Sequence, residues 1–352
     1  MRIAILGDTH FGVRGDSIAF HNNYREFYSK IFFPYLIENN IDTIWQLGDL
    51  FDRRKYINFQ SLALCRKYFF DVMMQQGMTF YTLLGNHDVA FKNTLEINSP
   101  QLLLKDYSNV NIIDAPISWA GDIDIIPWIC SDNEKEISTF IKNSKNTICF
   151  GHFELSGFEM DRGNVCNEGM DPAILKRYEL VLSGHFHHKS SKGNITYVGT
   201  PSEHTWADYN DIRGFHILDT NTKEMEFVEN PFRMFYKINY NDSTLLYDEV
   251  VNTDYSHLSN KYVKIVVEER SNSFLFDTLI DHITKYNPLE LLVVEDFTDY
   301  SGNNVDIEVD QAEDTITILS KYIDGLTLPV ESGTIKDILR DIYNEAMSME
   351  TE

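Results

Sequence analysis

The chain has 352 residues, of which 43% are hydrophobic and 24% charged, and its 30 Lys and Arg stand against 54 Asp and Glu for a net charge of −24. This composition predicts a globular protein with room for one large and one smaller domain, and it excludes a disordered or fibrous chain. No run approaches the about 20 apolar residues of a membrane-spanning helix, and no signal peptide opens the chain. Four cysteines without a CxxC pair exclude a disulfide scaffold or a cysteine-ligated zinc site and favour a reducing compartment.

Up to Asn230 the pattern predicts alternating strands and helices. Aromatic and apolar residues recur at helical spacing from Phe20 to Tyr35, and a second periodic helix covers about 59–74. The short strand-like runs lie at 2–6, 43–47, 79–84, 123–129, 147–150 and 180–182. We expect a mixed α/β domain over residues 1–230.

Two further regions follow Asn230-Pro231. Residues 231–305 predict a small α+β capping domain, with a helix at about 274–286 and strands at 235–240, 262–267 and 289–294. Residues 306–352 predict a C-terminal helical hairpin. Its second helix carries one apolar face, made of Ile335, Ile338, Leu339 and Ile342. Such a face either packs on its own domain or binds a partner.

Five apolar runs end at a glycine that is followed by a potential metal ligand. They are Leu6-Gly7-Asp8, Leu47-Gly48-Asp49, Leu84-Gly85-Asn86, Phe150-Gly151-His152 and Ser183-Gly184-His185. The same loops supply further groups, namely His10, His87, Asp88 and His187. Because ligands collect beyond the carboxyl ends of strands in α/β sheets, we expect these side chains to converge. One such junction alone is more often a turn, so the prediction depends on the set of five.

Two carboxylates, one amide and four imidazoles can surround a pair of divalent cations, with Asp49 as the natural bridge. Two cations about 3.5–4 Å apart activate a water and clamp the attacking and leaving oxygens in phosphoester cleavage. Mixed imidazole and oxygen ligands favour Mn²⁺, with Mg²⁺, Fe²⁺ and Zn²⁺ as alternatives. If Asn86 is a ligand, His87 can act as general acid, oriented by Asp88. The chain has no GxxxxGK[ST] loop, so we expect it to bind no nucleotide alone.

These motifs resemble the signature of the calcineurin-like metallophosphoesterase superfamily, and within it the SbcD-type DNA repair and recombination nucleases. The matching segments are Gly-Asp-Thr-His-Phe-Gly (7–12), Gly-Asp-Leu-Phe-Asp (48–52), Gly-Asn-His-Asp (85–88), Gly-His-Phe (151–153) and Gly-His-Phe-His (184–187). The short, acidic chain is most similar to the recombination endonuclease subunits of T-even bacteriophages. The resemblance implies a β-sandwich core flanked by helices.

The resemblance also implies a function and partners. The chain would be a metal-dependent DNA exonuclease and single-strand endonuclease, acting in the host bacterial cytoplasm. It would bind an SMC-like coiled-coil ATPase subunit of the SbcC type through its final helices, as a homodimer within a heterotetramer. One metal would be held by Asp8, His10, Asp49 and His187, and the other by Asp49, Asn86, His152 and His185, with His87 as the catalytic histidine.

The acidic net charge argues against a DNA partner, because DNA binding depends on cationic groups that displace counterions. Two divalent cations would make the local charge at the site positive. Directly after the second motif come Arg53, Arg54 and Lys55, which either contact phosphates or form a solvated turn. A phosphoprotein phosphatase, a small-molecule phosphodiesterase and a non-catalytic scaffold remain alternatives. Helix 59–74 forms either a homodimer seam or core. His21, His188 and His204 receive no role.

Overall fold

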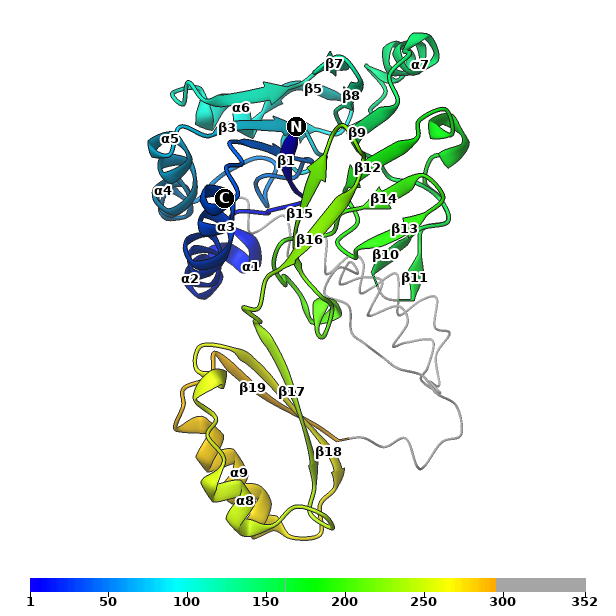
Figure 1. Ribbon diagram of the computed structural model, residues 1–352. Coiled ribbons are helices and arrows are strands. Elements are labelled where there is room, and N and C mark those ends of the chain that lie inside the picture. Colours follow the sequence, from blue (N-terminus) through cyan, green and yellow to red (C-terminus); the bar gives the residue numbers. More distant parts are fainter. Residues whose placement is uncertain (162, 296–352) are drawn as a thin grey trace, which may run out of the picture. The chain divides into compact units, whose positions relative to one another are not determined.

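The computed structural model describes residues 1–161 and 163–295, and it contains two six-stranded sheets (Figure 1). The first sheet has the order β16(Met225–Glu229), β15(Gly214–Asp219), β1(Arg2–Leu6), β2(Thr43–Gln46), β3(Thr79–Leu83) and β6(Val110–Ile113). The second has the order β13(Ser190–Lys192), β14(Ile195–Tyr197), β12(Leu180–Gly184), β9(Ile148–His152), β8(Ile123–Ile126) and β7(Ile117–Trp119). All six predicted strands of residues 1–230 are therefore confirmed.

Each sheet has a parallel centre. In the first, β1, β2, β3 and β6 run parallel, and in the second, β8, β9, β12 and β14 do so. Parallel strands end at the same edge of a sheet, so the loops that follow them lie together. This arrangement brings the five glycine-ligand junctions to neighbouring strand ends.

Apolar side chains from both sheets form one core between them. Trp45 of β2 stacks on Tyr81 with ring centroids 4.6 Å apart, and it meets Phe150 of β9 edge-on at 5.8 Å. The strands carry continuous apolar runs because both faces of a parallel sheet are buried. The domain is thus the expected β-sandwich, and its four cysteines are free and buried.

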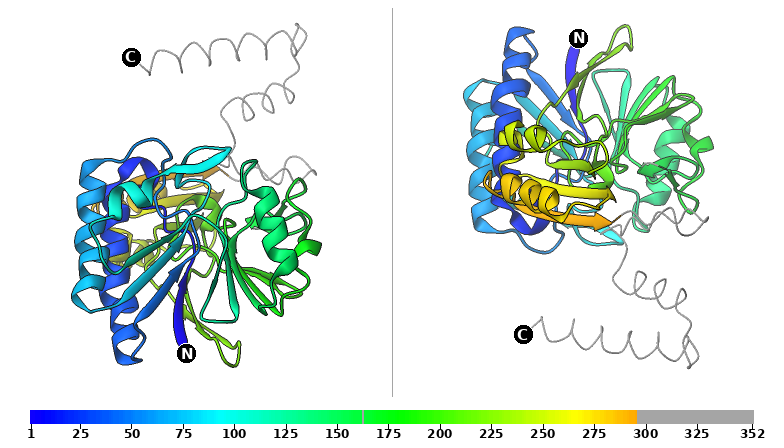
Figure 2. Two further views of the ribbon diagram at one scale, coloured as in Figure 1. Left: turned by 90° about the horizontal axis from the view of Figure 1, so that it is seen from above. Right: turned by 90° about the horizontal axis from the view of Figure 1, so that it is seen from below.

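Helices cover the outer faces of the sandwich (Figure 2). Beside the first sheet lie α2(Ile18–Phe27), η1(Tyr28–Phe32) and α3(Phe33–Glu38), followed in the chain by α4(Phe59–Cys65), η2(Arg66–Phe70) and α5(Asp71–Gln75). Phe69 contacts Phe80 of β3 at 5.6 Å between ring centroids, and Phe32 contacts Phe215 of β15 at 4.8 Å. On the second sheet, α7(Glu134–Asn143) buries Ile137 and Ile141.

The helix predicted at 59–74 therefore contributes to the core. Tyr68, Phe69 and Met73 are buried, whereas Leu62 and Val72 are half-buried. None of the helices in the described ranges is long and apolar enough to cross a membrane. The remaining short elements of this region are α1(Val13–Asp16), β4(Val89–Phe91), β5(Thr94–Asn98), α6(Ser99–Leu104), β10(Glu159–Asp161), β11(Asn164–Val165), η3(Pro172–Leu175) and η4(Trp206–Asp208).

The region after Asn230 forms a smaller three-stranded sheet with its own core. Its elements are β17(Phe235–Asn241), α8(Tyr247–Asn252), η5(Ser256–Leu258), β18(Tyr262–Glu269), α9(Ser273–Thr284) and β19(Glu290–Glu295). The three strands are parallel and alternate with helices, so this small unit of helices and strands is a βαβαβ arrangement. The predicted hairpin at 306–352, with Ile335, Ile338, Leu339 and Ile342, lies outside the described residues.

Candidate metal centre

The loops after β1, β2, β3 and β12, together with the end of β9, bring the seven predicted ligands into one cluster. Ligand atoms of Asp8, His10 and Asp49 lie within 4.8 Å of one another, and so do those of Asp49, His152 and His185. Asp49 belongs to both groups, as expected of a bridging carboxylate. Asn86 and His187 join the cluster through the direct contacts described next.

One side of the cluster gathers around His10. Its Nε2 lies 3.1 Å from Nε2 of His187 and 3.9 Å from Oδ2 of Asp49. Nε2 of His187 lies 3.9 Å from Oδ2 of Asp8. His10, Asp8 and Asp49 are buried, while the His187 side chain is about one-third exposed. This side therefore offers two imidazoles and two carboxylates, with an opening at His187.

The other side of the cluster gathers around Asn86. Its Oδ1 lies 2.9 Å from Nε2 of His152 and 2.9 Å from Nδ1 of His185. Nε2 of His152 also lies 3.3 Å from Oδ2 of Asp49, whereas its Nδ1 faces the carbonyl oxygen of Leu47 at 2.7 Å. That carbonyl fixes the ring so that Nε2 points into the cluster, a role that outer groups commonly have at metal sites.

The backbone is left-handed at three of these residues. His10, Asp49 and His185 have φ values of 43°, 55° and 86°. Residues other than glycine seldom adopt this region of backbone conformation. Hydrogen bonds hold each turn: the N–H of His10 donates to the Asp49 carbonyl, and the N–H of His185 donates to both oxygens of Asp8 at 3.0 Å. Strained backbone of this kind persists where surrounding contacts enforce it, and it concentrates at functional sites.

The two residues predicted to be catalytic have different environments. His87 is half-buried, with its ring 4.9 Å from that of His10, and its Nδ1 donates to the Asp52 carbonyl at 2.7 Å. Asp88 is fully buried and accepts hydrogen bonds from backbone N–H groups of Asp49, Leu50, Phe51 and Gly85. The expectation that Asp88 orients His87 is therefore wrong: Asp52 orients the ring, and Asp88 ties the β2 and β3 loops together.

Burial and mutual interaction shift the pKa values of the cluster. Burial and repulsion from Asp49 raise the pKa of Asp8 to about 7. Burial opposes the charge on Asp49, but the adjacent His152 holds the pKa of Asp49 well below its usual range. Burial and the neighbouring His152 lower the pKa of His185 to about 3, and burial with His87 lowers that of His10. Burial, which disfavours the charged form, accounts for the shifts of Asp8, His185 and His10, whereas attraction to His152 accounts for that of Asp49.

The donor set fits divalent metal ions. It combines imidazoles with carboxylate and amide oxygens, the ligand types that Mn, Fe and Zn accept. A dication among these groups would replace the repulsion between Asp8 and Asp49 with attraction to both. The buried carboxylates and facing imidazole nitrogens are thus chemically suited to bind metal.

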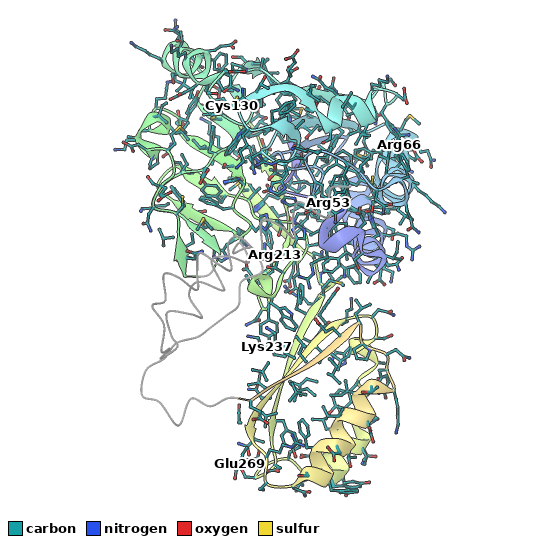
Figure 3. The ribbon with its side chains drawn as sticks, turned by 180° about the vertical axis from the view of Figure 1, so that it is seen from behind. Arg53, Arg66, Cys130, Arg213, Lys237 and Glu269 are labelled. Atoms are coloured by element: carbon teal, nitrogen blue, oxygen red, sulfur yellow. The ribbon has the colours of Figure 1, made fainter. Side chains whose placement is uncertain are left out.

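Of the three residues predicted to bind phosphate, Arg53 already contacts other side chains of the chain. Nη1 of Arg53, which is labelled in Figure 3, lies 3.3 Å from Oδ2 of Asp16, and its guanidinium lies 4.9 Å from the centre of the Tyr56 ring. Arg54 is half-buried and Lys55 is exposed. Of the histidines without a predicted role, His21 is held by Tyr68 and Ser61, and His188 lies 2.9 Å from Asp211.

Sequence reasoning missed three supporting residues. Asp52, the last residue of Gly-Asp-Leu-Phe-Asp, holds His87 through its carbonyl. Trp128 lies beside the second side of the cluster, with its ring 5.3 Å from that of His185. Arg213 is buried, donates to the His187 carbonyl and pairs with Asp208 at 2.7 Å (Figure 3). Only Asp52 had a local signal, because the other two reach the site through long-range contacts.

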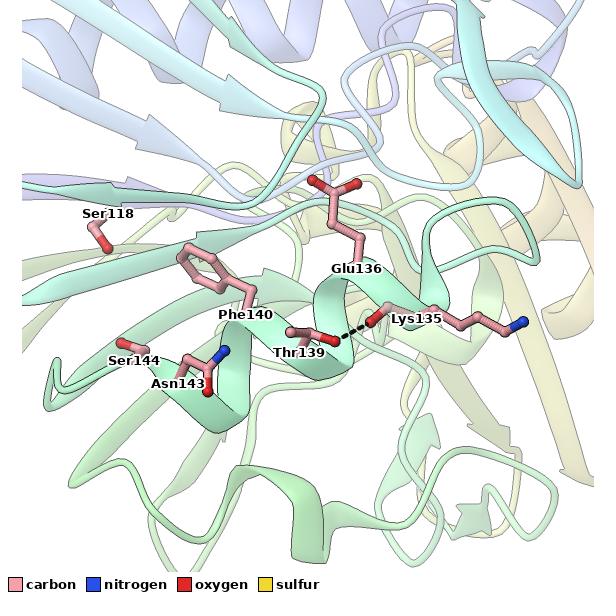
Figure 4. Close-up of a pocket in the computed structure, with 7 residues that line it drawn as sticks. All are labelled: Ser118, Lys135, Glu136, Thr139, Phe140, Asn143 and Ser144. Carbon is pink, nitrogen blue, oxygen red and sulfur yellow. Dashed lines mark hydrogen bonds between the residues drawn. The ribbon is translucent and has the colours of Figure 1, made fainter.

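A hollow beside α7 is separate from the ligand cluster. Its volume is about 640 Å³, and Figure 4 shows its lining of Ser118, Lys135, Glu136, Thr139, Phe140, Asn143 and Ser144. None of these residues belongs to the metal-ligand cluster, so the hollow is not part of the candidate centre.

Comparison with known proteins gives a family and a relative. Residues 1–189 match the model of the calcineurin-like phosphoesterases. Exonuclease subunit 1 of Enterobacteria phage T4 is 33% identical over 330 residues, which cover 93% of this chain and 93% of the phage protein.

Two solved structures are more distant. An archaeal phosphodiesterase is 14% identical with a TM-score of 0.32, over 65% of this chain and 99% of its own. A hypothetical protein from Thermus thermophilus is 14% identical with a TM-score of 0.37, over 66% of this chain and 100% of its own.

Gly184→Ala should disrupt the cluster, because the added Cβ would meet the Leu47 carbonyl and would lie 2.6 Å from Oδ1 of Asp8. We expect about 1–3 kcal/mol of destabilisation, typical of overpacking, together with weaker Mn²⁺ binding. Gly77→Ala is the control, since nothing lies within 4 Å of its Cβ and only its positive φ carries a cost, of about 1–2 kcal/mol. Urea unfolding and Mn²⁺ titration measure both effects. Wild-type Mn²⁺ affinity in Gly184→Ala would contradict the expectation.

Proposed function

The chain belongs to the calcineurin-like phosphoesterase family, and from this premise we propose that it is a metal-dependent DNA nuclease of the SbcD type. It would hydrolyse phosphodiester bonds as exonuclease and single-strand endonuclease during DNA break processing and recombination. The observation that carries this proposal is the 33% identity to T4 exonuclease subunit 1, which extends over 93% of both chains. So long a match includes the capping region as well as the phosphoesterase core. We place the activity in the cytoplasm of a bacterial host because that relative is a phage protein.

We assign the metal ligands to two overlapping sets. The first metal would be held by Asp8, His10, Asp49 and His187, and the second by Asp49, Asn86, His152 and His185. The convergence of their donor atoms and the position of Asp49 in both groups support this assignment. When bound, two divalent ions lower the pKa of a water and neutralise the charge that develops on the phosphoryl oxygens.

We assign His87 the role of general acid. The Asp52 carbonyl is only an acceptor, so Nδ1 of His87 carries a proton in either charge state of the ring. In the imidazolium form Nε2–H is then available to protonate the departing oxygen. The half-buried ring of His87 lies 4.9 Å from that of His10, beside the proposed first metal, which supports this role.

The proposal is tested with the purified full chain, linear duplex DNA and circular single-stranded DNA, in Mn²⁺, Mg²⁺ or chelator. We expect cleavage in Mn²⁺, none in chelator, and a loss of about 10²–10⁴-fold in His87→Ala, the typical contribution of a general acid. His257→Ala is the matched control, since His257 is an exposed histidine of the capping region.

The outcomes separate the alternatives. Hydrolysis of bis-p-nitrophenyl phosphate without any DNA cleavage would favour a small-molecule phosphodiesterase, and activity on a phosphoprotein alone would favour a phosphatase. No activity on any substrate, with Mn²⁺ bound, would favour a scaffold. Equal rates for His87→Ala and wild type would remove the assignment of His87.

We further propose that Arg54 and Lys55 contact phosphates beside the scissile bond. Arg53 is paired with Asp16 and lies over Tyr56, so it is less available than its two neighbours. The three residues directly follow the Gly-Asp-Leu-Phe-Asp loop that carries Asp49. This basic segment and the metals would supply the positive potential that the net charge of −24 does not.

Arg54→Ala with Lys55→Ala should weaken DNA binding and make it less dependent on salt. The slope of log affinity against log salt should fall by about 0.7–0.9 for each phosphate that the variant no longer neutralises. Hydrolysis of the small phosphodiester should stay at wild-type rates, because the ligand cluster is untouched. Lys135→Ala with Lys142→Ala on α7 changes the charge equally and serves as control. Equal salt slopes for both double variants and wild type would contradict the phosphate contacts.

We propose that residues 306–352 bind an SMC-like coiled-coil ATPase of the SbcC type, with the chain as a homodimer within a heterotetramer. The relative is named a subunit, which supports a partner. On helix 59–74, half-buried Leu62 and Val72 beside the buried Tyr68 leave an outer face for a second copy.

Ending the chain at Pro329 removes the apolar face of the last predicted helix. The shortened chain should fail to co-purify with the ATPase while retaining Mn²⁺-dependent cleavage. Co-purification at the wild-type level would contradict the partner site, and insolubility would show that the helix packs on its own domain.

A further inference from the structure

His204 is a buried histidine beside the metal-ligand cluster that has no assigned role. Its side chain is 1% exposed, and neither Nδ1 nor Nε2 has a hydrogen-bond partner among the described residues. Other buried histidines do have partners: His21 contacts Ser61 and Tyr68, and Nε2 of His216 faces the Val198 carbonyl at 3.2 Å. A buried polar group without a partner is unfavourable, so His204 requires a partner that residues 1–161 and 163–295 do not provide.

The ring of His204 faces the first side of the cluster. Its centroid lies 5.4 Å from that of His10 and 5.5 Å from that of His187, both at nearly right angles. Nitrogen atoms of these three rings lie within 4.8 Å of one another. Three imidazoles at this separation form a group in which each ring can present a nitrogen to a shared ion.

The loop that carries His204 is held in place from several directions. The N–H of His204 donates to Oδ2 of Asp208 at 2.6 Å, and Asp208 pairs with buried Arg213. The preceding Glu203 accepts from the N–H groups of Met234 and Phe235. These hydrogen bonds fix the backbone of the loop, and the His204 ring itself packs against those of His10, His187 and Tyr24. The fold therefore places the ring beside the ligand cluster.

We propose that His204 is an additional ligand of the first metal ion, beside His10 and His187. The inference rests on the metal centre of the proposed function and adds a residue to it. The ring is buried within reach of the same point as His10 and His187, and the first metal ion is therefore the partner we infer for it. The extra imidazole would make the first site richer in nitrogen than the second and would bias it towards ions that favour imidazole over water.

The test is Mn²⁺ binding by the full-length protein, followed through the free-ion EPR signal, in wild type, His204→Leu and His216→Leu. His216→Leu removes another buried imidazole, but from β15. We expect the wild type and His216→Leu to bind two ions with equal affinity. His204→Leu should bind one of the two ions at least about tenfold more weakly, the size of loss typical when a group that supports a metal site is removed. Imidazole nitrogen couplings in pulsed EPR should fall only in His204→Leu.

Unfolding curves in chelator show whether the variants fold without metal. If His204→Leu does not fold, His204→Gln takes its place, because it retains a polar side chain of similar size. Wild-type affinity for both ions in the folded variant would overturn the inference and leave the proposed function intact. A wild-type protein that binds no Mn²⁺, Mg²⁺, Fe²⁺ or Zn²⁺ would overturn both.

Discussion

The Asp88 carboxylate is the contact on which the geometry of the centre depends. It lies under the turns after β2 and β3 and accepts N–H groups from Asp49, Leu50 and Gly85 at 2.8–2.9 Å and from Phe51 at 3.3 Å. These donors would otherwise be unpaired in a buried turn, which is costly. By binding them, Asp88 holds Asp49 in its left-handed conformation and directs the Asp49 carboxylate towards the candidate ligand His152 of the second sheet.

Other hydrogen bonds at the centre connect the two sheets of the sandwich. The N–H of His185, after β12 of the second sheet, donates to Asp8, after β1 of the first. His152 on β9 contacts the Leu47 carbonyl after β2. The ligand cluster therefore spans the interface between two sheets whose apolar faces already pack together. Because the core fixes the distance between the sheets, the donor atoms are positioned before any ion binds, which is how rigid elements preorganise a site.

Much of this arrangement follows from local sequence. The strands could be predicted because parallel strands carry continuous apolar runs, and the convergence of the candidate ligands because five of them follow a glycine at a strand end and the other two lie two residues further on. The roles of Asp88 and His204 could not be predicted. Asp88 is next to His87 in the chain, but it points beneath the loop while the histidine faces outwards. His204 reaches the cluster through a loop anchored by Asp208 and Arg213, and no spacing rule signals such a contact.

The net charge of the chain says little about the charge at the candidate metal centre, because the surface and the buried centre screen charge differently. A net charge of −24 describes a solvated surface whose potential falls off within about 10 Å at 0.1 M salt. The candidate metal centre lies at the sandwich interface, where its buried groups are poorly screened and respond mainly to one another. There, burial and Asp49 raise the pKa of Asp8, His152 lowers that of Asp49, and burial lowers those of His10 and His185. An acidic protein can therefore attract divalent ions at this site and, through them, present positive charge to a phosphodiester.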